Sequence, residues 1–128
     1  MVIDGIFNLN EKKENIVCSI KRGQKKVLKR NGKPYKKFSN HIGLVPVVLI
    51  SPYDNDLIND GSNERRKFID SIISQNDRNY LQNLISYSKV IQNRNKLLKL
   101  YNKSVDFDLD TIKVYNDQIV KLSKPTFE

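Results

Sequence analysis

Apolar and polar residues alternate between Val2 and Phe38, and this period of two is typical of β-strands. Asn31 and Gly32 both accept a positive φ, so this pair predicts a tight hairpin turn. One face of the resulting sheet is poor in apolar residues, and we expect it to meet solvent or a partner. The pattern predicts an antiparallel meander of four strands over Val2–Leu9, Ile16–Arg22, Lys25–Arg30 and Lys33–Phe38.

After residue 61 the apolar spacing changes to three and four, which predicts helices. Ser62 and Asn63 are candidate N-caps, and Glu64 falls in the first turn, where the helix dipole favours an anion. Asn76 and Asp77 are expected to end this first helix. Its apolar stripe comprises Phe68, Ile69, Ile72 and Ile73.

Two further helices are predicted beyond Asp77, which should cap the second. The second helix should run from Arg78 to about Lys103, and its apolar positions Leu84, Ile91 and Leu98 recur every seven residues. Asp108 should cap a third helix over Leu109–Leu122, and Pro125 should end it. The short linker between these helices predicts that they pack antiparallel.

The residues between the two patterns suggest a junction. Ser39 and Asn40 could cap one helical turn over His41–Leu44, and 47–50 is apolar throughout, as in a strand buried on both faces. The fold class expected is therefore α+β: an antiparallel β-meander plus a core strand, followed by a three-helix lobe. We expect two domains, one at residues 1–50 that holds the meander and core strand and one at residues 51–128 that holds the helical lobe.

The net charge of +9 is concentrated in one part of the chain. Residues 11–37 hold eleven Lys or Arg against two Glu, whereas the remainder carries twelve charges of each sign. Such a local excess favours a polyanionic partner such as a nucleic-acid backbone, although lysine-rich hairpins also keep sheet edges soluble. The candidate phosphate contacts are Lys21, Arg22, Lys25, Lys26, Lys29, Arg30 and Lys33.

Residues that could carry catalysis or bind a metal are few. Cys18 is the single cysteine and His41 the single histidine, and both are expected to be structural. The loop with Asp54, Asp56 and Asp60 lacks the spacing of a calcium loop and fits turn formation better. No apolar run is long enough to cross a bilayer, and no signal-peptide pattern is present, so we expect a cytoplasmic protein.

Two stretches, ISPYDNDLINDGSNERRKFIDSIISQ at residues 50–75 and YSKVIQNRNKLLK at residues 87–99, closely resemble the bacterial RecF family of DNA replication, recombination and repair proteins. In that family a strand-to-helix segment reads S-P-x-D-x-x-L-I-x-x-G-S-x-x-R-R-x-F-I-D, and a long helix ending in Q-x-R-N-x-L-L-K follows. The resemblance implies an ATPase head of the ABC type, related to SMC proteins. The meander would then belong to that head, and the helices would form its helical lobe.

The resemblance also implies what a full-length relative does. Family members bind ATP with magnesium, dimerise on DNA in an ATP-dependent manner, and act with RecO and RecR to load RecA at gapped or single-strand/double-strand junction DNA. None of the five glycines begins the phosphate-binding loop G-x-x-x-x-G-K-[ST], and the ABC signature and acidic Walker B strand are absent. We therefore expect an interior piece of such a protein that is not an enzyme by itself and holds no cofactor.

Further positions matter only in the light of this resemblance. Ser51 and Asp54 fall near the place where related heads carry a nucleotide-proximal glutamine, and they equally suit a plain strand-to-loop junction. The arginines Arg65, Arg66 and Arg94 could bind phosphate or could lock the aspartate-rich loop onto the helix. Two other functions stay open: a stand-alone basic nucleic-acid-binding module, and a helical interaction module without DNA contact.

Overall fold

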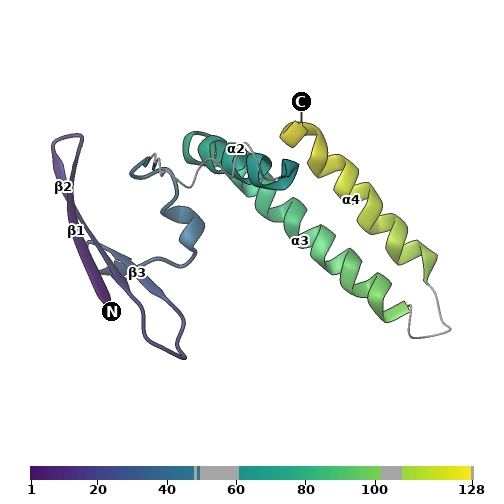
Figure 1. Cartoon of the computed structure of the whole chain (residues 1–128), viewed down its shortest axis with the longest axis horizontal. Coiled ribbons are helices and arrows are strands. Elements are labelled where there is room, and N and C mark those ends of the chain that lie inside the picture. The colour runs from purple at the N-terminus through teal and green to yellow at the C-terminus, as the bar shows by residue number, and fades with distance from the viewer. Residues whose placement is uncertain (48, 50–60, 102–107, 128) are drawn as a thin grey trace. The chain divides into compact units, whose positions relative to one another are not determined.

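The computed structural model describes residues 1–47, 49, 61–101 and 108–127. The chain divides into two compact units, Met1–Val45 and Pro46–Glu128, of which the first is a β-sheet and the second is helical (Figure 1). The α+β class expected from the sequence is confirmed. The domain boundary expected at residue 50 stays a prediction. No helix in the described part is long and apolar enough to cross a membrane.

The first unit holds a four-stranded antiparallel sheet in the order β1-β2-β3-β4, which confirms the predicted meander. The hairpin at Asn31 and Gly32, with φ of 50° and 78°, joins β3 to β4 as the sequence indicated. The first turn instead uses Asn10 and Glu11, both with positive φ. The strands are β1 (Val2–Leu9), β2 (Lys12–Ser19), β3 (Val27–Arg30) and β4 (Lys33–Pro34).

Four strand boundaries differ from the prediction. β2 begins and ends earlier than predicted, and β3 begins at Val27 rather than Lys25, which leaves a long basic loop between them. β4 stops at Pro34, which has no amide proton for the ladder. The single helical turn expected over His41–Leu44 is instead a 3-10 helix, η1, over Phe38–Asn40.

The second unit contains three helices: α2 (Ser62–Asn76), α3 (Arg78–Tyr101) and α4 (Leu109–Phe127). Asp77 caps α3, because its Oδ1 accepts hydrogen bonds from the amides of Asn79 and Tyr80 at 2.7 and 3.0 Å. Asp108 caps α4 in the same manner. Both of these predicted caps are confirmed.

Two predicted helix ends are wrong. The N-cap of α2 is Gly61, in extended conformation and without a side-chain hydrogen bond, so Ser62 and Asn63 lie inside the helix. α4 continues through Pro125 to Phe127, beyond the predicted end at Leu122. A helix end read from sequence therefore carries an error of a few residues.

Helices α3 and α4 lie side by side and run in opposite directions, as the short linker predicted (Figure 1). Leu81 on α3 and Ile112 on α4 are buried, and the predicted positions Leu84, Ile91 and Leu98 are half-buried. Arg94 Nε donates to Asn116 Oδ1 at 2.7 Å and joins the two helices. This α3–α4 seam is the apolar core of the unit.

A side-chain hydrogen bond joins helix α2 to α3. Tyr80 Oη donates to Asp70 Oδ1 at 2.5 Å, and burial together with this carboxylate raises the pKa of Tyr80 to about 12. The predicted stripe of α2 (Phe68, Ile69, Ile72 and Ile73) is present but exposed, between 36% and 53%. The described part of the chain therefore leaves this face of α2 uncovered.

The predicted core strand falls largely outside the described residues. Val48 and Ile50 are not described, and Val47 and Leu49 have no strand conformation. The loop with Asp54, Asp56 and Asp60 also lies outside the described part. Within the second unit, the amide of Val47 donates to Gln75 Oε1 of α2 at 2.8 Å.

Candidate nucleic-acid interface

The basic residues of the first unit gather at the loop that joins β2 to β3. Gly23 has a φ of 75°, in the left-handed region that glycine tolerates best, and the amide of Gln24 donates to the carbonyl of Lys21 at 3.1 Å. This tight turn places four exposed cations on one short segment: Lys21, Arg22, Lys25 and Lys26. We call this segment, residues 20–26, the basic loop.

The remaining candidates lie on the strands and do not share one face. Lys29 and Arg30 are neighbours in β3, so their side chains point to opposite faces of the sheet. Lys29 and Lys33 are exposed, as phosphate contacts must be. The candidate residues therefore form a basic loop with two outlying lysines, Lys29 and Lys33.

Arg30 has a structural partner that the sequence did not reveal. Its Nε and Nη2 donate to the two carboxylate oxygens of Glu14 at 2.8 and 2.6 Å, and Asn31 Nδ2 donates to Glu14 Oε2 at 2.6 Å. The hydrogen bond from Arg30 lowers the pKa of Glu14 to about 2, and Glu14 in turn raises the pKa of Arg30. Arg30 thus organises the hairpin, and its guanidinium is less available to phosphate than the lysines are.

His41 packs against the same region, as expected of a structural histidine. Its ring makes an edge contact with Tyr35, with centroids 5.4 Å apart and planes at 65°, and its Nδ1 lies 3.3 Å from Tyr35 Oη. Burial, and next the positive charge of Arg30, lower the pKa of His41. This contact fixes the chain that leaves β4 and enters η1.

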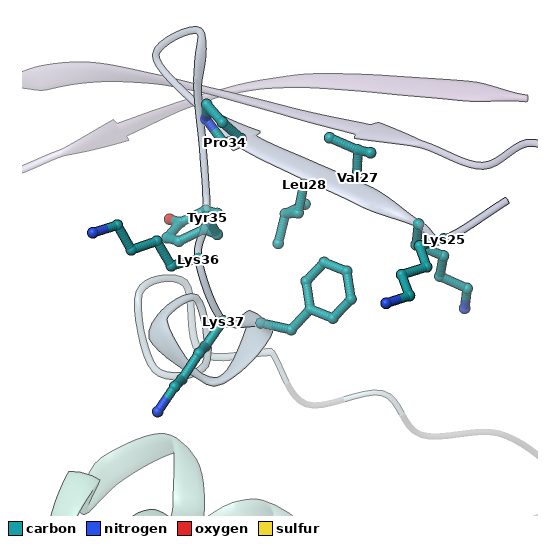
Figure 2. A pocket seen from close by; sticks show the side chains of 9 residues that line it. Lys25, Val27, Leu28, Pro34, Tyr35, Lys36 and Lys37 are labelled. Carbon is teal, nitrogen blue, oxygen red and sulfur yellow. The ribbon is translucent and has the colours of Figure 1, made fainter.

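A groove of about 500 Å³ opens beside the basic loop (Figure 2). Its apolar lining comes from β3 and from the chain beyond it: Val27, Leu28, Pro34, Tyr35 and Phe38. Lys25 lies at one end of the groove, beside Val27, and Lys36 and Lys37 lie at the other, near Tyr35 (Figure 2). We call this the Phe38 groove.

The Phe38 groove was not predicted from the sequence. The available signal was the short run from Tyr35 to Phe38, in which two aromatic residues flank Lys36 and Lys37. A second groove, of about 430 Å³, also borders the basic loop and includes Lys21, Arg22 and Lys25. The basic loop therefore borders two hollows.

The three candidate arginines of the helical unit fall into different environments. Arg94 is engaged by Asn116 and joins α3 to α4, which is a structural role. Arg65 and Arg66 are exposed in the first turns of α2, and Asp70 is engaged by Tyr80. The proposed loop partners Asp56 and Asp60 lie outside the described residues, as do Ser51 and Asp54.

The described ranges 1–47, 49, 61–101 and 108–127 contain no cluster of metal-ligating side chains. No group of three His, Cys, Asp or Glu residues there could hold an ion. Cys18 is a free, half-buried thiol on β2. The side chains that the first unit offers to a ligand are the lysines and aromatic residues of the Phe38 groove and the basic loop.

Comparison with known proteins decides the family. No family model matches the chain. The "DNA replication and repair protein RecF" of Flavobacterium johnsoniae is 57% identical over 127 residues, which cover 99% of this chain and 35% of that protein. The RecF of Parabacteroides distasonis is 49% identical over 108 residues, covering 84% of this chain and 29% of its own length. The chain belongs to the RecF family.

Two solved structures of RecF agree with this assignment. Structures described as the recombination mediator protein RecF in the RecFOR pathway, one with ATP and one with ATPrS, superpose with TM-scores of 0.90 and 0.86. Each is 28% identical to this chain and covers 98% of it, but only 34% of the RecF structure is matched. The chain spans about a third of the length of the RecF proteins that it matches.

Proposed function

We propose that this chain is the part of a RecF-type recombination mediator whose basic loop contacts DNA phosphates. The observation that carries the proposal is the gathering of Lys21, Arg22, Lys25 and Lys26, all exposed, in one loop of a RecF family member. When exposed lysines neutralise DNA phosphates, the cations that had been condensed on the DNA are released, and this release favours association. The bridge between Arg30 and Glu14 supports the hairpin next to the loop.

The charge pattern supports contact with phosphates without base-specific readout. Between Glu14 and Asp54 the chain carries nine Lys or Arg and neither Asp nor Glu. Lysine is a flexible point charge, and it binds phosphate without the paired geometry that reads a guanine edge. Binding to duplex DNA should therefore be weak, independent of sequence and steeply dependent on salt.

The longer protein to which such a segment belongs would bind ATP with magnesium, dimerise on DNA, and act with RecO and RecR to load RecA at gapped or junction DNA. This part of the proposal rests on family membership. The 128-residue chain alone should not hydrolyse ATP, since its sequence contains no G-x-x-x-x-G-K-[ST] loop to cradle the phosphates. We propose a cytoplasmic location, as for other proteins acting on the bacterial chromosome.

The exposed stripe on α2 favours a second role, for the helical unit. Four large apolar side chains, Phe68, Ile69, Ile72 and Ile73, form a continuous face on this helix. Because the chain spans a third of its relatives, we propose that another segment of the same RecF polypeptide covers this face.

Fluorescence anisotropy with a labelled duplex tests the DNA contact. The six exposed basic residues of the first unit proposed as contacts would neutralise at most six phosphates, so the plot of log K against log salt should have a slope no steeper than about −5. Changing Lys25, Lys26 and Lys29 to Glu should abolish binding at moderate salt. The matched control changes Lys89, Lys96 and Lys121 to Glu, three exposed lysines of the helical unit, and should bind nearly as the parent does. Equal binding by both variants would overturn the proposal.

A further inference from the structure

The turn between β3 and β4 contains the one Asn-Gly pair of the sequence, Asn31 and Gly32. Such a pair is chemically weak, because the backbone nitrogen of the glycine can attack the side-chain carbonyl carbon of the asparagine, and glycine has no side chain to hinder the approach. Both residues are exposed, so water reaches them. The pair is therefore a candidate for covalent modification without an enzyme.

The folded hairpin holds the side-chain amide of Asn31 at both of its ends. Its Oδ1 accepts the amide of Asn15 at 2.8 Å, and its Nδ2 donates to Glu14 Oε2 at 2.6 Å. The backbone amide of Asn31 also donates to the carbonyl of Asn15 at 2.8 Å, so side chain and backbone are both tied to β2. Attack by the Gly32 nitrogen requires the side chain to turn toward the next residue, and this movement breaks both side-chain hydrogen bonds.

The acceptor of the Asn31 side-chain amide is itself fixed in place. Glu14 is only 9% exposed and binds Arg30 through both carboxylate oxygens, at 2.8 and 2.6 Å. The hydrogen bond from Arg30 lowers the pKa of Glu14 to about 2, so at neutral pH this carboxylate carries no proton that it could give to a departing amine. The network of Glu14, Arg30 and Asn31 therefore opposes the reaction by its geometry and by its charge.

We infer that Asn31 is a site of spontaneous deamidation, which this network delays while the hairpin is closed. In the reaction the Gly32 nitrogen forms a bond to Cγ of Asn31 and loses its proton, the bond from Cγ to Nδ2 breaks, and ammonia leaves with that proton. Water then opens the resulting cyclic imide at either carbonyl carbon. The products are aspartate and isoaspartate, and in isoaspartate the main chain runs through the former side chain. The modification does not require the proposed DNA contact.

The products change the network that delays their formation. Aspartate in place of Asn31 puts a carboxylate oxygen where Nδ2 donated to Glu14, so two negative charges face each other. Isoaspartate lengthens the main chain by one carbon and disturbs the register that places Lys33 opposite Arg30. Because the ammonia is lost to solvent, the modification accumulates in chains whose hairpin has opened.

The first measurement compares the folded chain with chains that lack the hairpin. The 128-residue chain, the same chain in guanidinium chloride and a synthetic peptide of residues 27–36 are incubated at the same mildly alkaline pH. Mass spectrometry of the tryptic fragment that contains Asn31 follows replacement of the amide by a carboxyl group, and an isoaspartate methyltransferase assay detects the second product. The folded chain should react at least about tenfold more slowly than the other two, because it reacts only during local opening. Equal rates, or no reaction in the peptide, would overturn the inference.

Variants of Glu14 show whether the network causes the delay. Glu14→Ala removes the acceptor of Asn31 Nδ2 and should raise the rate in the folded chain about fivefold, the factor that corresponds to one lost hydrogen bond. Glu14→Gln keeps a side-chain carbonyl that can accept this bond, so its rate should lie between those of Glu14→Ala and the parent, and it serves alone if circular dichroism shows Glu14→Ala to be unfolded. The matched control Glu64→Ala, at an exposed glutamate of α2, should react as the parent does. Parent rates in the folded Glu14 variants would mean that the network does not protect Asn31, against the inference.

A variant that carries the product residue tests the effect on the sheet. Asn31→Asp should lower the Tm of the β unit, followed by the amide NMR signals of the sheet, by about 4 to 8 °C, the shift expected for the loss of one such contact in a small domain. Asn10→Asp makes the same change in the turn between β1 and β2, where φ is also positive (48°), and should lower the Tm by less than about 2 °C. An unchanged Tm in Asn31→Asp, or an equal loss in both variants, would show that the product does not act through Glu14, and that part of the inference would fail.

Discussion

The two units of the chain are stabilised by different kinds of interior. In the β unit, the residues with the least exposure are Ile16 and the carboxylate-bearing Glu14, whose oxygens accept three hydrogen bonds from Arg30 and Asn31. In the helical unit they are the apolar Leu81 and Ile112, together with Tyr80 and Ser74. A polar network depends on the charge of its members, whereas an apolar seam depends on volume. The two units should therefore respond to different perturbations.

The same contrast appears in the surface charge. Residues 1–45 carry eleven Lys or Arg against three acids, a net charge of +8, whereas the rest of the chain has twelve against eleven. In the β unit, Glu14 forms an ion pair with Arg30. The lysines of this unit and Arg22 are exposed. The exposed surface of the helical unit includes the apolar residues of α2. The excess of positive charge therefore lies in the β unit, whereas the helical unit is nearly neutral.

The largest effect should come from the α3–α4 seam. Leu81→Ala removes a side chain that is 5% exposed and should destabilise the helical unit by about 2 to 5 kcal/mol. Urea unfolding followed by the amide NMR signals of each unit measures this, and the signals of the β unit should be unaffected. The control Ile69→Ala, at a position 53% exposed, should cost less than about 0.5 kcal/mol. A large loss in this control would mean that the face of α2 is covered in solution.

The next effect concerns acid stability of the β unit. The pKa of Glu14 falls from its usual 4.5 to about 2 in the folded chain, so its contribution is complete above about pH 4.5 and is lost as the pH falls toward 2. Glu14→Gln should lower the Tm of the β unit at neutral pH and make it nearly independent of pH over that window. Monitoring the amide of Ile16 by NMR against pH in both proteins measures the difference.

The helical unit provides the internal comparison for that titration. Asp108 is its acid-sensitive cap, because hydrogen bonds from the Thr111 side chain and amide lower the pKa of Asp108. Asp108→Asn retains a good capping side chain without a charge and should remove the acid sensitivity of the α4 N-terminus. If Glu14→Gln shifts the acid response of α4 while leaving that of the sheet unchanged, the assignment of a polar interior to the β unit is wrong.

The smallest effect should come from the cap of α3. Asp77→Ala removes the side-chain acceptor for two backbone amides and should cost the helical unit about 1 kcal/mol. Asp77→Asn should be nearly neutral because its carbonyl oxygen can accept the same bonds. Urea midpoints of the three proteins test this, and a loss equal in both variants would show that the charge of Asp77, and not its hydrogen bonds, stabilises α3.

The sequence by itself determined the kind and order of the elements. Alternation with a period of two, a period near 3.6, the Asn31-Gly32 turn and the caps Asp77 and Asp108 are local features, so they could be read without knowing what packs where. The RecF motif was also contiguous in sequence, and it gave the family that the comparisons confirm. Boundaries were less accurate at β2, β3, β4, α2 and α4, whose ends lie a few residues from the predicted positions.

Only the tertiary structure decided which side chains meet. The register that pairs Ile16 with Arg30 brings Arg30 diagonally next to Glu14, sixteen residues away in sequence, and so changes a candidate phosphate contact into an internal ion pair. The turn into η1 likewise brings Phe38 into the same groove as Lys25 and Lys26, which no local pattern indicates. Pairings across strands and turns depend on register and chain path, because residues distant in sequence become neighbours only after the sheet has formed.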